Sequence, residues 1–242
     1  MVAGCLSLDA QVKVIAHRGY WKAPESAQNS VAGLMKADEI GAYGSEFDVW
    51  MSREGKLYVN HDRRFRGVDI YKNTYSRICK VRLKNGERIP LLNHFLKSAE
   101  EETDIRLILE MKSLPTAEEE RLAAELIVDE VRRCNLLDRT DFIAFSMNAC
   151  KTFRRLLPDA RVFYLGGDVC PQEIKSLGLS GIDYAAHVLK RHPEWVQEAH
   201  RLGLEVNVWT VNRKRNMRRF IRMGVDYITT DRPDILLKLL CE

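Results

Sequence analysis

The chain has 242 residues, of which 45% are hydrophobic and 30% are charged. This composition is typical of a soluble globular protein, and it excludes the collagen-like, low-complexity and disordered classes. A chain of this length forms its own core without disulfides, and it allows one large domain or two small ones. The 38 basic and 34 acidic side chains give a net charge of +4, too small to indicate a nucleic-acid or membrane partner.

The six cysteines and the first residues leave the cellular compartment open. The cysteines are scattered without a C-x-x-C pair, which argues against zinc and against a disulfide framework. Residues 1–11 form an N-terminal segment that lacks the charged start and full apolar region of an export signal. They are expected to be either a disordered or edge-of-barrel N-terminus of a cytoplasmic protein, or the remnant of a signal peptide cut after Ala10. The second alternative would indicate a periplasmic or secreted protein. No apolar stretch is long enough for a transmembrane segment.

Short β-rich segments alternate with amphipathic segments along the chain. The expected strands are 12–16, 45–50, 57–60, 105–111, 142–145, 161–165, 182–186, 204–210 and 227–230. The expected helices are 30–40, 91–102, 116–134, 148–157, 193–202, 214–223 and 233–240, with Asn29 placed to cap the first. This alternation predicts βαβ units and a parallel sheet, and about eight repeats are typical of a (β/α)8 TIM barrel. We therefore predict a single-domain barrel over residues 12–242.

A doubly wound open sheet is the alternative fold. The first strand is followed by Ala16-His17-Arg18-Gly19, which is no glycine-rich phosphate-binding turn, and this favours the barrel. Residues 62–90 carry no clear helical face and are rich in Arg, Lys and Asn. They are expected to form a loop excursion that replaces or precedes the second barrel helix.

Three carboxylates stand where a barrel places its working residues, at the C-terminal ends of the strands. Glu46 and Asp48 are two apart on one strand, so both side chains point the same way, and Glu110 ends another strand. Carboxylates without a thiolate favour one hard divalent cation, Mg²⁺ or Ca²⁺. The alternative is an inward salt-bridge network with Arg18 and Lys112.

Two histidines also end apolar strands beside charged neighbours. His17 and His61 are candidates for proton transfer, because histidine titrates near neutral pH. Arg18 and Lys112 supply positive charge for an anionic substrate, and arginine reaches phosphate oxygens in a bidentate manner. The other histidines are interpreted as structural: His94, His187, His192 and His200.

Taken in chain order, these motifs resemble the glycerophosphodiester phosphodiesterase family. The set comprises Ala16-His17-Arg18-Gly19, Glu46-x-Asp48, Val59-Asn60-His61-Asp62, Leu109-Glu110-Met111-Lys112, Val208-Trp209-Thr210-Val211-Asn212 and residues 224–233. The similarity covers about residues 12–240. It implies a barrel enzyme that uses one divalent metal to cleave glycerophosphodiesters, releasing an alcohol and glycerol 3-phosphate.

The resemblance also implies a role for each candidate residue. His17 and His61 are the acid and base, Glu46, Asp48 and Glu110 bind the metal, and Arg18 and Lys112 bind the phosphate. Trp209 lines the pocket for the organic part of the substrate. The family usually carries Pro-Glu-Asn-Thr where this chain has Ala27-Gln28-Asn29-Ser30, so Gln28 replaces a carboxylate and lowers the local negative charge. The segment 21–25 is an insertion expected to reshape the pocket rim.

Three other functions are open alternatives. The first is a barrel that binds a phosphate ligand without turnover, and the second is a phospholipase-type reaction on a lysolipid or phosphoinositol head group. The third is nucleic-acid binding through the basic segment 213–222. In that segment Met217, Phe220 and Ile221 have helical spacing, which favours a packed helix with a solvated outer face. The expected partner is therefore a small-molecule substrate and no nucleic acid, for a monomer or small homo-oligomer.

Overall fold

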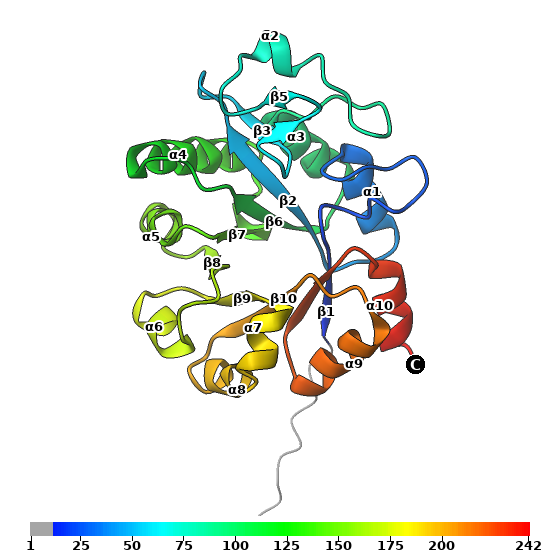
Figure 1. Cartoon of the computed structure of the whole chain (residues 1–242), viewed down its shortest axis with the longest axis vertical. Helices are drawn as coiled ribbons and strands as arrows, with labels where there is room; N and C mark the ends of the chain where they lie inside the picture. The colour runs from blue at the N-terminus through cyan, green and yellow to red at the C-terminus, as the bar shows by residue number, and fades with distance from the viewer. Residues whose placement is uncertain (1–11) are drawn as a thin grey trace, which may run out of the picture.

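Within residues 12–242, the part of the chain that the structure describes, eight parallel strands of the computed structural model close into a barrel (Figure 1). In order around it, the strands are β1 (Lys13–Ala16), β2 (Gly44–Met51), β6 (Arg106–Met111), β7 (Thr140–Ala144), β8 (Arg161–Tyr164), β9 (Gly181–Ala185), β10 (Glu205–Trp209) and β11 (Tyr227–Thr230). The barrel closes because β1 pairs with both β2 and β11. The predicted TIM barrel is confirmed, and the signal-peptide hypothesis falls on residues 1–11, outside the described part.

Helices cover the outside of the barrel in Figure 1. They are α1 (Val31–Glu39), α3 (Leu92–Glu102), α4 (Ala117–Arg133), α5 (Met147–Leu156), α6 (Pro171–Ser176), α7 (Ala186–Arg191), α8 (Glu194–Arg201), α9 (Lys214–Met223) and α10 (Pro233–Leu240), with a 3₁₀ turn at Leu137–Arg139. The main core lies between this ring and the strands. The seven expected helices are confirmed. The six-residue helices α6 and α7 were not predicted, because so short a segment shows no clear periodicity.

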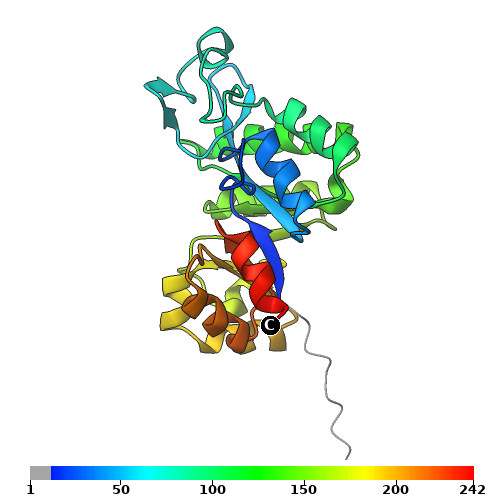
Figure 2. The same cartoon turned by 90° about the vertical axis from the view of Figure 1, so that its right-hand side faces the viewer.

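The excursion at 62–90 precedes the second barrel helix. It follows β3 (Leu57–Val59), which pairs antiparallel with the end of β2, and contains the β4–β5 hairpin (Arg64–Phe65 and Val68–Asp69) and the short α2 (Tyr75–Ile78). The excursion and neighbouring residues form a separate small apolar cluster that includes Tyr58, Ile70 and Ile78. The segment extends beyond the helix ring at one end of the molecule in Figures 1 and 2.

Apolar side chains fill the inside of the barrel, and an ionic network lies near its N-terminal end. Ile15, Ile108 and Phe163 belong to the interior cluster. Arg161, the first residue of β8, forms an ion pair with Asp141 at 3.3 Å. A barrel filled in this way is a packed core and not a pore, so a substrate site has to lie at the C-terminal end.

The basic segment 213–222 lies mostly within α9. Met217 and Phe220 are fully buried, while the arginines and lysines of this helix face solvent. This arrangement confirms a packed helix with a solvated outer face. The described cysteines, at positions 79, 134, 150, 170 and 241, are free thiols. No helix in residues 12–242 is both long and apolar enough to cross a membrane.

Candidate active site

The three expected carboxylates meet at the mouth of the barrel. Glu46 and Asp48 project from β2, and Glu110 from the neighbouring β6, where the parallel register places it directly opposite Asp48. Each offers an oxygen within 4.8 Å of the others. All three side chains are buried, with exposures of 3%, 1% and 7%. The strand pairing therefore concentrates three acidic groups in a space that water hardly reaches.

Two cations partly neutralise this carboxylate cluster. Lys112 Nζ lies 2.7 Å from Asp48 Oδ1 and 2.6 Å from Glu110 Oε1, and Arg18 Nε lies 3.7 Å from Asp48 Oδ2. The alternative of an inward salt-bridge network is thus partly realised. Glu46 differs, because its Oε2 accepts only the backbone N–H of Arg18, at 2.8 Å. Its other oxygen, Oε1, is buried and has no hydrogen-bond partner among the described residues.

The electrostatics of the cluster indicate a missing positive charge. Burial and the two neighbouring carboxylates raise the pKa of Glu46 well above its ordinary value. Burial and Asp48 also raise the pKa of Glu110 to about 8. Burial opposes the ionisation of Asp48 too, but Lys112 and His61 hold its pKa at about 2. A buried, unpartnered carboxylate oxygen within a set of oxygen donors fits a hard divalent cation, so the residues present suit the metal that the sequence predicts.

The loop after β1 turns Arg18 toward this cluster. Arg18 has a φ of +57°, in the left-handed region, and this conformation aims its N–H at Glu46. Gly19 follows with a φ of +76°, and a Cβ at this position would lie 2.6 Å from the carbonyl carbon of Gly33 in α1. Gln28 accepts a hydrogen bond from Arg18 Nη1 at 3.0 Å. The amide that replaces the family's carboxylate therefore orients Arg18 and is not part of the carboxylate cluster.

Asn29 has a role that the sequence did not indicate. Its side chain brackets Asp48, donating from Nδ2 to Oδ2 at 2.8 Å and accepting the backbone N–H at Oδ1 at 3.0 Å. The prediction that Asn29 caps α1 is wrong. Ser30 is the cap, and its hydroxyl accepts the N–H of Gly33 at 2.9 Å. Asn29 has a φ of +58°, which is outside the right-handed helical region, and α1 starts two residues later, at Val31.

The two candidate histidines are held in the same manner. His17 Nδ1 lies 2.7 Å from Asp231 Oδ1, and His61 Nδ1 lies 2.7 Å from Asp62 Oδ1. Neither Nε2 has a hydrogen-bond partner within residues 12–242. Burial lowers the pKa of His61, and Lys112 adds to this effect. Sequence reasoning missed the contact of Asp231, although Asp231 follows β11 in the same way that His17 follows β1.

The remaining histidines have other surroundings, and of these His187 also follows the C-terminal end of a barrel strand, β9. His94 and His187 are exposed on helices, and His192 stacks on Trp195 with ring centroids 4.3 Å apart. His200 pairs with Asp226 at 2.9 Å, at the start of β11 and so at the opposite end of the barrel strands from Asp231. The structural role of these four histidines stays a prediction.

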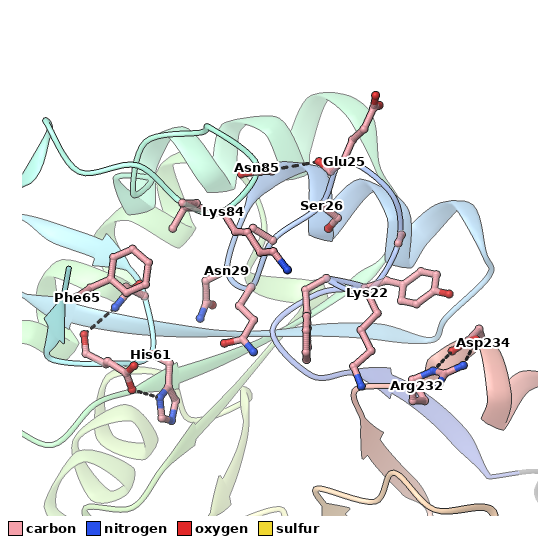
Figure 3. A pocket seen from close by; sticks show the side chains of 18 residues that line it. Lys22, Glu25, Ser26, Asn29, His61, Phe65, Lys84, Asn85, Arg232 and Asp234 are labelled. Carbon is pink, nitrogen blue, oxygen red and sulfur yellow. Dashed lines mark hydrogen bonds and ion pairs between the residues drawn. The ribbon is translucent and has the colours of Figure 1, made fainter.

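A cavity of about 800 Å³ opens beside His61 (Figure 3). Figure 3 shows His61 and Phe65 on one side of it and Lys22 and Arg232 on the other. Its lining also includes Trp21, Gln28, Asn29, Glu25 and Lys84. Both the insertion at 21–25 and the excursion at 62–90 thus shape the rim. A second cavity, of about 660 Å³, lies against His61 and is lined by Arg63, Arg64 and Lys112.

Trp209 is not part of the lining of the 800 Å³ cavity. It ends β10, donates its indole N–H to the carbonyl of Asp183 at 3.0 Å, and meets Phe145 edge-on with ring centroids 5.6 Å apart. The indole that does line this cavity is that of Trp21. The family resemblance implied a pocket role for Trp209, which ends a strand, whereas Trp21 lies in the loop after β1.

Acidic, basic and imidazole side chains gathered at the C-terminal mouth of a (β/α)8 barrel place the protein in the class of barrel enzymes, whose active sites lie at this end. The model of the Glycerophosphoryl diester phosphodiesterase family matches residues 17–235, and the chain belongs to this family. It is therefore a phosphoric diester hydrolase.

Individual relatives agree over almost the full length. A glycerophosphodiester phosphodiesterase from Caldanaerobacter subterraneus subsp. tengcongensis is 30% identical, over 94% of this chain and 97% of its own. A crystal structure of a glycerophosphodiester phosphodiesterase from Parabacteroides distasonis is 48% identical, with a TM-score of 0.95 and coverage of 96% and 98%. A phosphodiesterase from Oleispira antarctica, solved with the product sn-glycerol-3-phosphate, is 20% identical with a TM-score of 0.81 and shares the fold, covering 95% of this chain and 97% of its own.

Proposed function

We propose that the protein hydrolyses a glycerophosphodiester to an alcohol and glycerol 3-phosphate, using a divalent cation held by Glu46, Asp48 and Glu110. The observation that carries this proposal is the buried carboxylate cluster beside two imidazoles. Among residues 12–242, neither Glu46 Oε1 nor the Nε2 atom of either imidazole has a hydrogen-bond partner. Family membership supports the class of substrate. When bound, the cation neutralises charge on the phosphate oxygens and lowers the pKa of the attacking hydroxyl.

Arg18 and Lys112 bind the phosphate in this proposal. Both contact the carboxylate cluster, so the non-bridging phosphate oxygens meet positive charge on the protein side as well. Gln28 and the backbone turn after β1 restrict the guanidinium to one orientation. Such fixed charges need no rearrangement when negative charge builds on the phosphate, and this is the condition for effective transition-state stabilisation.

His17 and His61 move the protons. One imidazole takes the proton of the attacking water or hydroxyl at its Nε2, and the other gives a proton to the leaving alkoxide, so the proton count balances over one turnover. The lowered pKa of His61 keeps its imidazole neutral at neutral pH and able to accept a proton. Each transfer contributes about 10²–10⁴-fold to the rate.

Aromatic side chains receive the organic part of the substrate. Trp21 and Phe65 line the 800 Å³ cavity that reaches His61. Trp209 and Phe145 add a second apolar surface at the strand ends of β10 and β7, and Trp209 keeps its proposed contact with the substrate there. The rim of this cavity carries positive charge at Lys22 and Lys84 and negative charge at Glu25. Its charge therefore does not select one head group, and the assay below identifies it.

The test is release of glycerol 3-phosphate from a panel of glycerophosphodiesters. Glycerophosphocholine, glycerophosphoethanolamine, glycerophosphoinositol and glycerophosphoglycerol are incubated with the purified protein in Mg²⁺, in Ca²⁺ and in EDTA. Turnover of at least one substrate that depends on a divalent ion is expected. No turnover of any of them would refute the substrate class, and undiminished turnover after dialysis against EDTA would refute the role of the cation.

Two substitutions test the proton-transfer roles of His17 and His61. His17→Ala and His61→Ala are each expected to lower kcat by about 10²–10⁴-fold without unfolding the protein. His200→Ala is the matched control, because His200 also pairs with an aspartate but at the other end of the barrel. A kcat within about threefold of wild type in either test variant contradicts the assignment.

A further inference from the structure

Asp231 is placed beside His17 by the closure of the barrel. It directly follows β11, and His17 directly follows the neighbouring β1, in a register that pairs Ala16 with Thr230. The backbone N–H of His17 donates to the carbonyl of Thr230 at 3.0 Å, and the two side chains meet at 2.7 Å. Main-chain pairing on both sides therefore sets this contact, although the residues are 214 positions apart.

Further donors hold the carboxylate of Asp231. Trp21 Nε1 donates to Oδ1 at 3.1 Å, and Asn212 Nδ2 donates to Oδ2 at 2.6 Å. Asn212 also accepts the backbone N–H of Asp231 at 2.8 Å. Burial opposes the ionisation of this carboxyl, but its hydrogen bonds hold the pKa of Asp231 at about 2. An ionised carboxylate only accepts hydrogen bonds, so the proton shared with His17 belongs to Nδ1.

We propose that Asp231 is the positioning residue of His17, fixing the tautomer with its proton on Nδ1 and leaving Nε2 to exchange a proton with the substrate. This inference rests on the proposed function. A partly buried carboxylate in such a place orients the imidazole and stabilises the imidazolium that forms during turnover. Asp62 contacts His61 similarly, but its side chain is 65% exposed, against 17% for Asp231.

Trp21 connects this pair to the substrate cavity. Its ring lines the 800 Å³ cavity, and its N–H is one of the two side-chain donors that hold Asp231 in addition to His17. The insertion that carries Trp21 therefore contributes to the placement of His17 as well as to the rim. Trp21→Phe, which removes only this donor, is expected to lower kcat less than a change at Asp231.

The activity test is Asp231→Asn. The side-chain amide keeps the shape but offers an N–H toward Nδ1, which favours the wrong tautomer. We expect kcat to fall by about 10²–10⁴-fold with KM within about threefold of wild type. Asp226→Asn is the control, because Asp226 forms a carboxylate–histidine pair with His200 at the start of the same strand, and its kcat should equal that of wild type. An Asp231→Asn kcat within about threefold of wild type, or a loss confined to KM, overturns the proposal.

A spectroscopic test on the wild-type protein does not depend on Asp231→Asn folding. Long-range ¹H–¹⁵N correlation spectra of protein labelled at histidine report which ring nitrogen carries the proton, with His17→Ala used to assign the signals. The Nδ1–H tautomer is expected for neutral His17, and an Nε2–H tautomer overturns the proposal. If wild-type protein hydrolyses none of the panel, the proposed function fails while this readout still reports on Asp231.

Discussion

Replacing Glu46 by glutamine is expected to separate the contribution of the cation from the stability of the fold. Glu46 is 3% exposed, its Oε1 has no partner among the described residues, and burial together with Asp48 and Glu110 raises its pKa. Glu46→Gln keeps the volume and removes the charge. In a chelator the variant loses the repulsion from Asp48 and Glu110, so its free energy of unfolding should equal or exceed that of wild type.

The size of the effect follows from binding linkage. An ion present at a hundred times its Kd stabilises the folded state by about 2.7 kcal/mol. For a domain of this length, 1 kcal/mol shifts Tm by about 2–4 °C, so wild-type Tm should rise by about 5–10 °C. Glu46→Gln keeps only Asp48 and Glu110, both already paired with Lys112. Its shift should stay below about 2 °C.

The assay is thermal unfolding in EDTA and then in excess Mg²⁺ or Ca²⁺. Asp226→Asn is the control, since it removes a carboxylate at the other end of the barrel and should respond to the ion as wild type does. An equal shift in Glu46→Gln and wild type would refute the assignment of Glu46 as a ligand. A wild-type Tm that no divalent ion changes would refute the cation site itself.

Three further predictions concern charge, backbone and pH. Lys112→Met leaves the buried Glu110 without its cation and Asp48 with only Arg18, 3.7 Å away. It should cost about 3–5 kcal/mol in urea unfolding of the chelated protein, and a loss under about 1 kcal/mol would contradict this. Gly19→Ala should lower kcat by about tenfold or more, because its Cβ would lie 2.6 Å from the backbone of Gly33 and would displace the loop that carries Arg18. Gly41→Ala is the control: its φ of +75° is similar but the space around it is open, so its kcat should equal that of wild type. Burial raises the pKa of Asp183 to about 7. Because the folded state then binds a proton that the unfolded chain releases, Asp183 should make wild-type stability fall as pH rises from about 4 to 7, and Asp183→Asn should flatten this slope in urea titrations.

Local patterns determined the repeat of the fold and the carboxylates of the site. Most β-rich segments are recognisable from their own residues, so the eight barrel strands, β3 and the seven longer helices were predicted, but not the β4–β5 hairpin. Glu46 and Asp48 were predicted to share a face because side chains alternate along a strand. The rule that barrel enzymes work at strand ends then selected His17, Glu110 and Lys112, and the structure places Lys112 between the acids.

The excursion shows where local patterns fail. Residues 62–90 lack periodicity, and their course depends on packing of Tyr58, Ile70 and Ile78 into a cluster of their own. Sequence alone could therefore say that this segment interrupts the repeat, but not that its hairpin and loops form one wall of the cavity.

The sequence by itself determined which strands form and which acidic, basic and imidazole groups end them, because those properties depend on residues close together in the chain. Only the tertiary structure decided the partners of these groups. Asn29 brackets Asp48 from 19 residues away, and Asp231 meets His17 across 214 residues. Such contacts exist because pairing of the last strand with the first closes the barrel, and no local pattern records which distant side chains that closure brings within hydrogen-bond distance.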